Sequence, residues 1–523
     1  MQCLESAPLR QKGGTLASRG RWSDGLNPGE ECADITPTMT DHLLLAEACQ
    51  PTTSLTQVFE PTVRWTLRDR LSRRKWPLIV LVPFVAIGLL YLFEWNVLVH
   101  HAPLWAVGGD LWGIYRGAHY IGWGSLGGIY TSGTGIVAFP GMAVLLSPVA
   151  LITWHLHMTE SYGPFVLAHP SAALVLQPIE LLLASTVIFA SDALAERLGV
   201  VSRRRLWLCV AVAVIAWPTA ALWGHAEDSL AVAFALYAMV AMLDQKWAAM
   251  GWLFGFGIVM QPLVGLMLPL FLAATPQGQR VVLLVRSAVI SVILVGVAFL
   301  GDASDTYRQL VQQPTPPSVN HATPWAALSP KLTSGAIKTV HGASLARIAG
   351  HATLHAYTVT GAQVVEVSGG PGRMIGVILA ILVGAFVWRR PQSPSRVLWL
   401  AAVVLSLRCF FEPVMTPYYL APPLFMCLIL AARQSRRRFW PSVVIALEIT
   451  VFAYFHLNPW VWWLPIVTGL TAILALGYPN DQRTEHTGPA PVGTVPAPLE
   501  RVVIPAESIG VTVSERSPEP ALR

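Results

Sequence analysis

Long apolar runs recur through the middle of this chain, from Pro77 to Tyr478, while polar residues dominate both ends. A helix needs about 20 apolar residues to cross the hydrocarbon core of a bilayer. The pattern therefore predicts an all-α integral membrane protein, a bundle of about 11 to 13 transmembrane helices. The apolar runs lie at residues 77–99, 136–157, 170–194, 206–223, 229–243, 247–260, 262–273, 281–300, 372–388, 396–412, 418–432, 440–457 and 460–476.

The two runs that meet at Gln261-Pro262 are too short to cross the membrane upright. Proline ends or kinks a helix because it lacks a backbone N–H and clashes with the preceding turn. Such breaks are tolerated where the backbone faces protein or a cavity instead of lipid. We therefore expect two half-length helices here, broken at the proline.

Both ends of the chain lack long apolar runs. Residues 1–63 and 479–523 are rich in proline and small or polar residues, which predicts disordered cytoplasmic tails. No continuous apolar core precedes residue 60, so no secretory signal peptide is expected. The sequence leaves open whether translation starts at Met1 or at Met39. Residues 64–478 form the predicted polytopic membrane domain.

The composition supports a membrane protein. The chain has 523 residues, of which 54% are hydrophobic and 12% are charged, whereas soluble proteins carry about 25% charged residues. The formal net charge of +6 does not indicate nucleic acid, because the basic residues lie beside apolar runs, as orientation signals do. The 6 cysteines include no CxxC pair, so we expect buried free thiols instead of a disulfide framework.

Basic clusters predict which side each loop occupies, because cytoplasmic loops are enriched in Lys and Arg. The cluster Arg64–Lys75 precedes the first run, which places the N-terminus in the cytoplasm and the next loop outside. Arg389-Arg390 and Arg433–Arg438 are cytoplasmic by the same rule. The long segment 301–371 is therefore expected outside, and the C-terminus inside.

The cluster Arg203–Arg205 gives two conflicting counts of the crossings. Counting from the first run puts this cluster outside, whereas the charge rule puts it inside. Either one segment between residues 136 and 194 is re-entrant, or the cluster breaks the charge rule. The sequence leaves both explanations open.

Charged residues at the edges of apolar runs are candidate functional groups, because charge is costly in a membrane. Asp110 is the only carboxylate between Glu94 and Glu160, and it opens a loop (residues 108–148) rich in glycine and aromatic residues. We expect this loop to form part of a site. The further candidates are Tyr115, Arg116, Tyr130, Glu227, Asp228, Arg373, Arg408 and Glu412.

The pattern GGDLWGIYRGA…GSLGGIY…FPGMAVLLSP in this loop resembles the polyprenyl-phosphate-dependent glycosyltransferases of the GT-C fold. The similar branch is glycosyltransferase family 87, the polyprenol-phosphomannose-dependent mannosyltransferases. Asp110, Tyr115 and Ala118 match the family's D-x4-Y-x2-A pattern, and Gly128-Ile129-Tyr130 matches its G-x-L-Y element loosely. The family's aromatic-Pro-Pro motif is Phe139-Pro140-Gly141 here, with one proline lost.

The resemblance implies a GT-C-like bundle with a helical outer loop after the first span. It also implies a hexosyltransferase on the outer face of the cytoplasmic membrane, which would move a sugar, mannose by resemblance, from a polyprenyl-phosphate donor to an envelope glycan or glycolipid. Asp110 would be the general base for the acceptor hydroxyl, with inversion at the anomeric carbon. Basic residues would stabilise the leaving phosphate. We expect no cofactor, no metal and no nucleic-acid partner.

Several candidates also have a purely structural explanation. Asp110 can cap the helix that follows it, and Glu227-Asp228 can form the acidic first turn of a helix. Arg408 and Glu412 are four residues apart, so they can form an ion pair on one helix face. The sequence does not decide between these roles and substrate binding.

Two other functions fit the same features. A transporter or flippase of lipid-linked intermediates would also have broken helices and membrane charges, although no internal repeat relates the two halves of this chain. A non-catalytic scaffold of the same fold would explain the lost proline at Gly141. His351 and His355 have the spacing of a metal pair, but the third ligand and general base of a zinc enzyme are missing.

The predicted topology can be tested by cysteine labelling. A cysteine introduced at Ser334, within the segment expected outside, should react with a membrane-impermeant thiol reagent in intact cells. Labelling that requires permeabilised cells would reverse the predicted orientation.

Overall fold

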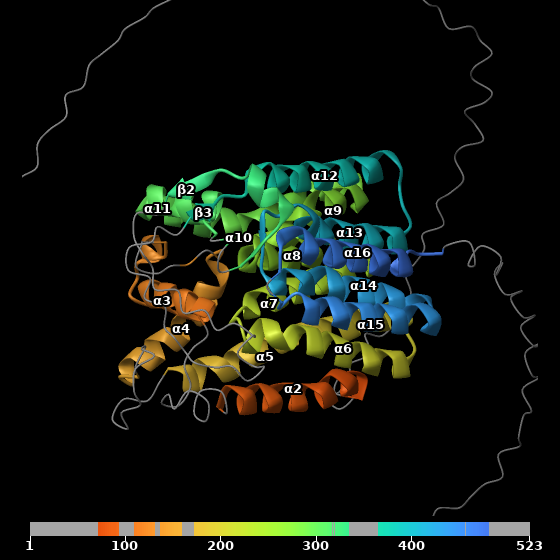
Figure 1. Ribbon diagram of the computed structural model, residues 1–523, viewed down its shortest axis with the longest axis horizontal. Helices are drawn as coiled ribbons and strands as arrows, with labels where there is room; N and C mark the ends of the chain where they lie inside the picture. The colour runs from red at the N-terminus through yellow and green to blue at the C-terminus, as the bar shows by residue number, and fades with distance from the viewer. Residues whose placement is uncertain are drawn as a thin grey trace, which may run out of the picture. The chain divides into compact units, whose positions relative to one another are not determined.

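Helices that run side by side form the membrane domain (Figure 1). The computed structural model describes residues 72–93, 109–130, 136, 138–158, 172–315, 317, 320–333, 365–455 and 457–480. The predicted tail 1–63 and nearly all of 479–523 lie outside the described residues, as do His351, His355 and Ser334.

The element bounds follow the predicted apolar runs closely, and the run 247–260 coincides with a helix. The helices are α2 Lys75–Phe93, α3 Gly109–Gly122, α4 Gly141–His155, α5 Ala173–Arg197, α6 Ser202–Ala221, α7 Ala226–Leu243, α8 Trp247–Met260, α9 Leu268–Ala274, α10 Arg280–Gly301, α11 Ala303–Tyr307, α12 Gly370–Arg389, α13 Pro394–Phe411, α14 Ala421–Gln434, α15 Arg436–Phe452 and α16 Pro459–Gly477. The short helical segments include η3 Leu126–Gly128, η4 Pro262–Met267, η7 Pro324–Leu328 and η9 Pro417–Leu420.

Within the described part of the chain, 7 helices are long and apolar enough to cross a membrane. They are α5, α6, α7, α10, α12, α13 and α16. Shorter apolar helices are α2, α4, α8 and the stretch Pro262–Ala274. The predicted all-α, multi-pass membrane protein is thus confirmed, and α3 supplies the expected helix after the first span.

The α7 helix is the most enclosed of these spans. Its buried residues include Ala231, Ala235 and Ala238, whose small side chains allow neighbouring helices to approach closely. It packs mainly between α5 and α8. The first turn of α7 is therefore held deep inside the bundle.

Two short antiparallel ladders involve the segment 301–371: one ties it to the bundle, and the other lies within the segment. β1 (His321–Ala322) pairs with β4 (Val414–Met415), and β2 (Lys331–Thr333) pairs with β3 (Val365–Val367). The strands are only 2 or 3 residues long. They hold connections in place and do not change the all-α class.

One end of the bundle is marked by arginines, and we call it the arginine end. Asp192 on α5 is fully buried and accepts hydrogen bonds from two arginines. Arg205 on α6 donates to both carboxylate oxygens at 2.7 Å, and Arg74, just before α2, donates at 2.8 Å. Arg204 bonds the Ala432 carbonyl at the end of α14. The starts of α2 and α6 and the ends of α5 and α14 therefore meet here.

The geometry of α2 and α5 bears on the crossing conflict at Arg203–Arg205. Helices α2 and α5 are antiparallel, since Arg74 meets Asp192 at the arginine end and Gly88 packs on Leu181 farther along both helices. The end of α2 and the start of α5 therefore both lie at the opposite end. This arrangement fits the re-entrant explanation, because α4, the predicted run 136–157, adds no net crossing. The arginine cluster then lies on the same side as Arg74.

The helices α3 and α4 pack against each other at that opposite end. Gly141, the first residue of α4, lies directly on the backbone of Val259 and Met260 at the end of α8. Between the two helices, η3 touches the last residue of α10: a Cβ built on Gly127 would lie only 2.6 Å from the Gly301 Cα. Two glycines in backbone contact thus join this helix pair to the bundle.

We expect Asp192→Asn to lower the free energy of unfolding by about 3–5 kcal/mol, because it leaves two arginines without their buried carboxylate. Thermal unfolding of the purified protein in detergent measures this loss. Asp244→Asn is the matched control: Arg197, its partner at 2.5 Å, is 53% exposed, so the loss should stay below about 1 kcal/mol. Equal losses in both variants would contradict the role of Asp192.

Candidate functional site

The turn between α6 and α7 carries two of the predicted site residues. Gly224 has a φ of +75°, which suits glycine, and turns the chain directly into α7. Glu227 and Asp228 occupy the first turn of α7, where the helix dipole favours negative charge. Both are buried. The predicted acidic helix start is therefore confirmed, inside the bundle instead of at its surface.

His225 is the first partner of these acids. Its Nδ1 lies 2.5 Å from Glu227 Oε1, and its ring packs on Tyr418 with centroids 3.9 Å apart. Tyr418 belongs to η9, which follows α13. His225 thus connects the start of α7 to η9, which lies almost 200 residues later in the sequence.

Gln261 is the second partner. Its Nε2 donates to Asp228 Oδ1 at 2.5 Å. Gln261 stands where α8 ends, with extended backbone (φ −147°), and Pro262 begins the next helical segment. The predicted break at the proline therefore exists, and it places a side-chain amide against a buried acid.

A third carboxylate, Glu180 on α5, completes this group. It is 4% exposed and close enough to interact electrostatically with Glu227 and His225. We call Glu180, His225, Glu227, Asp228 and Gln261 the carboxylate cluster. Glu180 is not among the residues predicted from the sequence, because it lies inside the apolar run 170–194 and the predicted site residues lie at the edges of such runs. A charged residue within a span was the signal available.

Arg373, Arg408 and Glu412 come together beside this cluster. Arg373, on the first turn of α12, donates to Glu412 Oε1 through Nε at 3.1 Å. Arg408 Nε lies 3.8 Å from Glu412 Oε2, and its guanidinium stacks 3.3 Å from the centre of the Tyr419 ring. The expected ion pair between Arg408 and Glu412 is present, and Arg373 adds a link between two helices.

Part of the segment 301–371 folds over the end of α13. Thr323 Oγ1 donates to the Glu412 carbonyl at 2.6 Å, and Trp325 Nε1 donates to the Phe410 carbonyl at 2.8 Å. His321 stacks on Trp462 with parallel rings 4.3 Å apart. The segment therefore borders the arginine–glutamate group.

Tyr115, Arg116 and Tyr130 lie within the α3–α4 unit. Tyr115 is fully buried, and its hydroxyl is hydrogen-bonded to Thr153 of α4. The Tyr130 hydroxyl donates to the Ala138 carbonyl at 2.9 Å, and burial raises the pKa of Tyr130. Arg116 is exposed and lies 5.0 Å from the centre of the Trp112 ring. The structure does not bring these three side chains into the carboxylate cluster.

Asp110 is the second residue of α3, and its side chain lies outside the described part. Its neighbour Leu111 contacts Gly224: a Cβ built on Gly224 would lie 2.8 Å from the Leu111 Cβ and 3.0 Å from the Leu111 nitrogen. The start of α3 therefore packs on the turn that leads into His225 and Glu227.

The carboxylate cluster holds oxygens without a hydrogen-bond partner among the described residues. They are Glu180 Oε1, Glu227 Oε2 and Asp228 Oδ2. An unsatisfied buried acceptor costs about 1–3 kcal/mol, and more when it is charged. Such a group is stable only if a proton, water or ligand donor completes it, so the cluster is suited to binding.

The described residues contain no group of three or more His, Cys, Asp or Glu side chains that could hold a metal ion. Comparison of the chain with protein-family models and with curated proteins finds no match. The function is therefore argued from the residues and their arrangement.

The contact between Gly224 and Leu111 can be tested against a matched glycine. Gly199 has the same φ of +75° but open space around its Cα. Alanine at either position should cost about 1 kcal/mol of backbone strain. Gly224→Ala should cost about 1–3 kcal/mol more, because its methyl group would displace α3. Thermal unfolding in detergent compares the two variants, and equal losses would show that α3 does not rest on this turn.

Proposed function

We propose that the protein is a membrane glycosyltransferase that moves a sugar, mannose by resemblance, from a polyprenyl-phosphate donor to an envelope glycan or glycolipid. Asp110 takes the proton of the acceptor hydroxyl as that oxygen attacks the anomeric carbon. The bond between this carbon and the phosphate oxygen breaks, and polyprenyl phosphate leaves. The active site then lies on the extracytoplasmic face of the cytoplasmic membrane, and both termini lie in the cytoplasm.

The observation that carries this proposal is the packing of Leu111 on Gly224. It brings the backbone of Asp110 beside the turn that holds His225 and Glu227. Three buried acids, Glu180, Glu227 and Asp228, thus lie near the backbone of Asp110 at one end of the bundle. Sugar hydroxyls are hydrogen-bond donors, and the unpartnered oxygens of the carboxylate cluster are suited to accept from them.

Arg373 and Arg408 provide the opposite charge that a leaving phosphate requires. Both guanidinium groups meet Glu412, so they are held at one place, next to Tyr418 and Tyr419. Each retains further N–H donors, since a guanidinium has five and binds phosphate in a fork. In this proposal they bind the donor phosphate and stabilise its charge as the sugar departs.

A transporter of lipid-linked intermediates is the second candidate. The helix break at Gln261-Pro262 beside the buried Asp228 favours it, because transporters place substrate sites at discontinuous helices. A transporter moves the lipid-linked sugar intact. An enzyme releases polyprenyl phosphate.

We expect Asp110→Asn to reduce sugar transfer by at least about a hundredfold, the usual contribution of a general base. Asparagine caps a helix about as well as aspartate, so the variant should still fold. The measurement is the glycolipid profile, by mass spectrometry, of a deletion strain complemented with either chain. It is combined with the release of polyprenyl phosphate from synthetic polyprenyl phosphomannose by membranes of the two strains.

Asp305→Asn is the matched control, because Asp305 lies on the short helix α11 outside the proposed site. It should restore the wild-type profile. Full activity of Asp110→Asn would remove Asp110 from the mechanism. A wild-type protein that moves labelled donor across liposomes without releasing polyprenyl phosphate would favour the transporter.

A further inference from the structure

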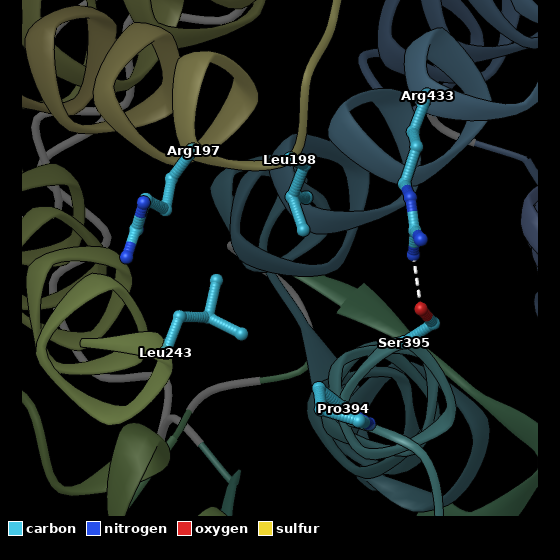
Figure 2. Close-up of a pocket in the computed structure, with 6 residues that line it drawn as sticks. All are labelled: Arg197, Leu198, Leu243, Pro394, Ser395 and Arg433. Atoms are coloured by element: carbon cyan, nitrogen blue, oxygen red, sulfur yellow. Dashed lines mark hydrogen bonds between the residues drawn. The ribbon is translucent and has the colours of Figure 1, made fainter. Parts of the chain in front are cut away.

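A cavity of about 370 Å³ lies at the arginine end, far along the helices from the carboxylate cluster. It is a shallow, open cavity bordered by the ends of α5, α7 and α14 and the start of α13. Figure 2 shows Arg197 and Arg433 on opposite sides of this cavity, with Leu198 between them. The lining residues are Arg197, Leu198, Leu243, Pro394, Ser395 and Arg433.

Positive charge dominates around this cavity. Arg433 donates to the Ser395 hydroxyl, and Arg204 bonds the carbonyl of Ala432, the residue before Arg433. Arg197 pairs with Asp244 at 2.5 Å, and Lys246 lies 3.4 Å from the same carboxylate. Four cations and one carboxylate leave three positive charges uncompensated. Glu196 does not alter this balance, because it pairs with Arg74 and Arg205.

The first turn of α13 adds to this field. Pro394 and Ser395, which line the cavity, are the first two residues of that helix. Pro394 has no N–H, and Ser393 accepts from the N–H groups of Arg396 and Val397, so this turn contributes chiefly the positive end of the helix dipole. The cavity is thus suited to an anion.

The remaining lining is apolar, which distinguishes lipid from a free anion. Leu198, Leu243 and Pro394 form part of the cavity wall. The cavity also stands where spanning helices begin and end, at the level of the phosphate layer of a bilayer. Since a water molecule takes about 30 Å³ of liquid volume, the volume of about 370 Å³ holds a headgroup of about ten heavy atoms.

We propose that this cavity binds the phosphate-bearing headgroup of an anionic phospholipid. Arg433 and Arg197 hold the phosphate from two sides, and the leucines contact the glycerol and the upper acyl chain. Basic pockets between spanning helices recognise anionic headgroups in this way. The site is separate from the proposed donor site, since Arg373 and Arg408 lie at the other end of α12 and α13.

The test uses the full-length protein in an uncharged detergent, with binding of dioctanoyl phosphatidylglycerol followed by native mass spectrometry. Arg433→Gln should weaken this binding at least about fivefold, because it removes a charge-assisted contact. Leu243→Phe fills the cavity without changing charge and should weaken it similarly. Arg437→Gln is the matched control: Arg437 is exposed and does not line the cavity, so its effect should stay below about twofold.

Dioctanoyl phosphatidylcholine, glycerol 3-phosphate and inorganic phosphate complete the comparison. Tighter binding of phosphatidylglycerol than of all three supports the proposal. Equal binding of glycerol 3-phosphate or phosphate would assign the cavity to a soluble anion and overturn it. Equal weakening of phosphatidylglycerol binding by Arg437→Gln and Arg433→Gln would also overturn the proposal. Unchanged binding in both Arg433→Gln and Leu243→Phe would do the same.

Discussion

The arrangement of this protein depends on the buried carboxylate of Asp192. An unpaired charge inside a membrane bundle is costly, so Asp192 requires both Arg74 and Arg205. This requirement fixes the start of α2 and the start of α6 against the end of α5. It therefore determines that the other ends of α2 and α5 lie together. The α3–α4 unit, which follows α2 and precedes α5 in the sequence, lies at that same end.

The two ends of the bundle handle charge differently. At the arginine end, Asp192 and Glu196 are matched by guanidinium groups. At the opposite end, Glu227 pairs with His225 and Asp228 with Gln261, and one oxygen each of Glu180, Glu227 and Asp228 has no hydrogen-bond partner among the described residues. Hydrogen-bond partners for all of these oxygens would make the fold more stable. Their incomplete pairing leaves acceptor oxygens at that end that a hydrogen-bond donor can complete.

Much of the fold follows from the sequence, because length and apolarity alone define a membrane helix. The bounds of α8 and α10 and the break at Gln261-Pro262 are evident in the apolar runs. The number of crossings is not evident from the apolar runs, since α4 is apolar like a span although its 15 residues make it shorter than the helices long enough to cross a membrane. The partners of Tyr115 and the approach of Glu180 to Glu227 depend on how helices distant in sequence pack. No local pattern carries that information.

The contact between Gly127 and Gly301 has an evolutionary consequence. Neither position accepts a side chain while the other backbone stays where it is, so the two residues form a coupled pair, 174 positions apart. A relative that carries alanine or a larger residue at either position must hold its α3–α4 unit farther from α10. Divergence at one of these two glycines would therefore be expected together with a shift of the whole helix pair relative to α10.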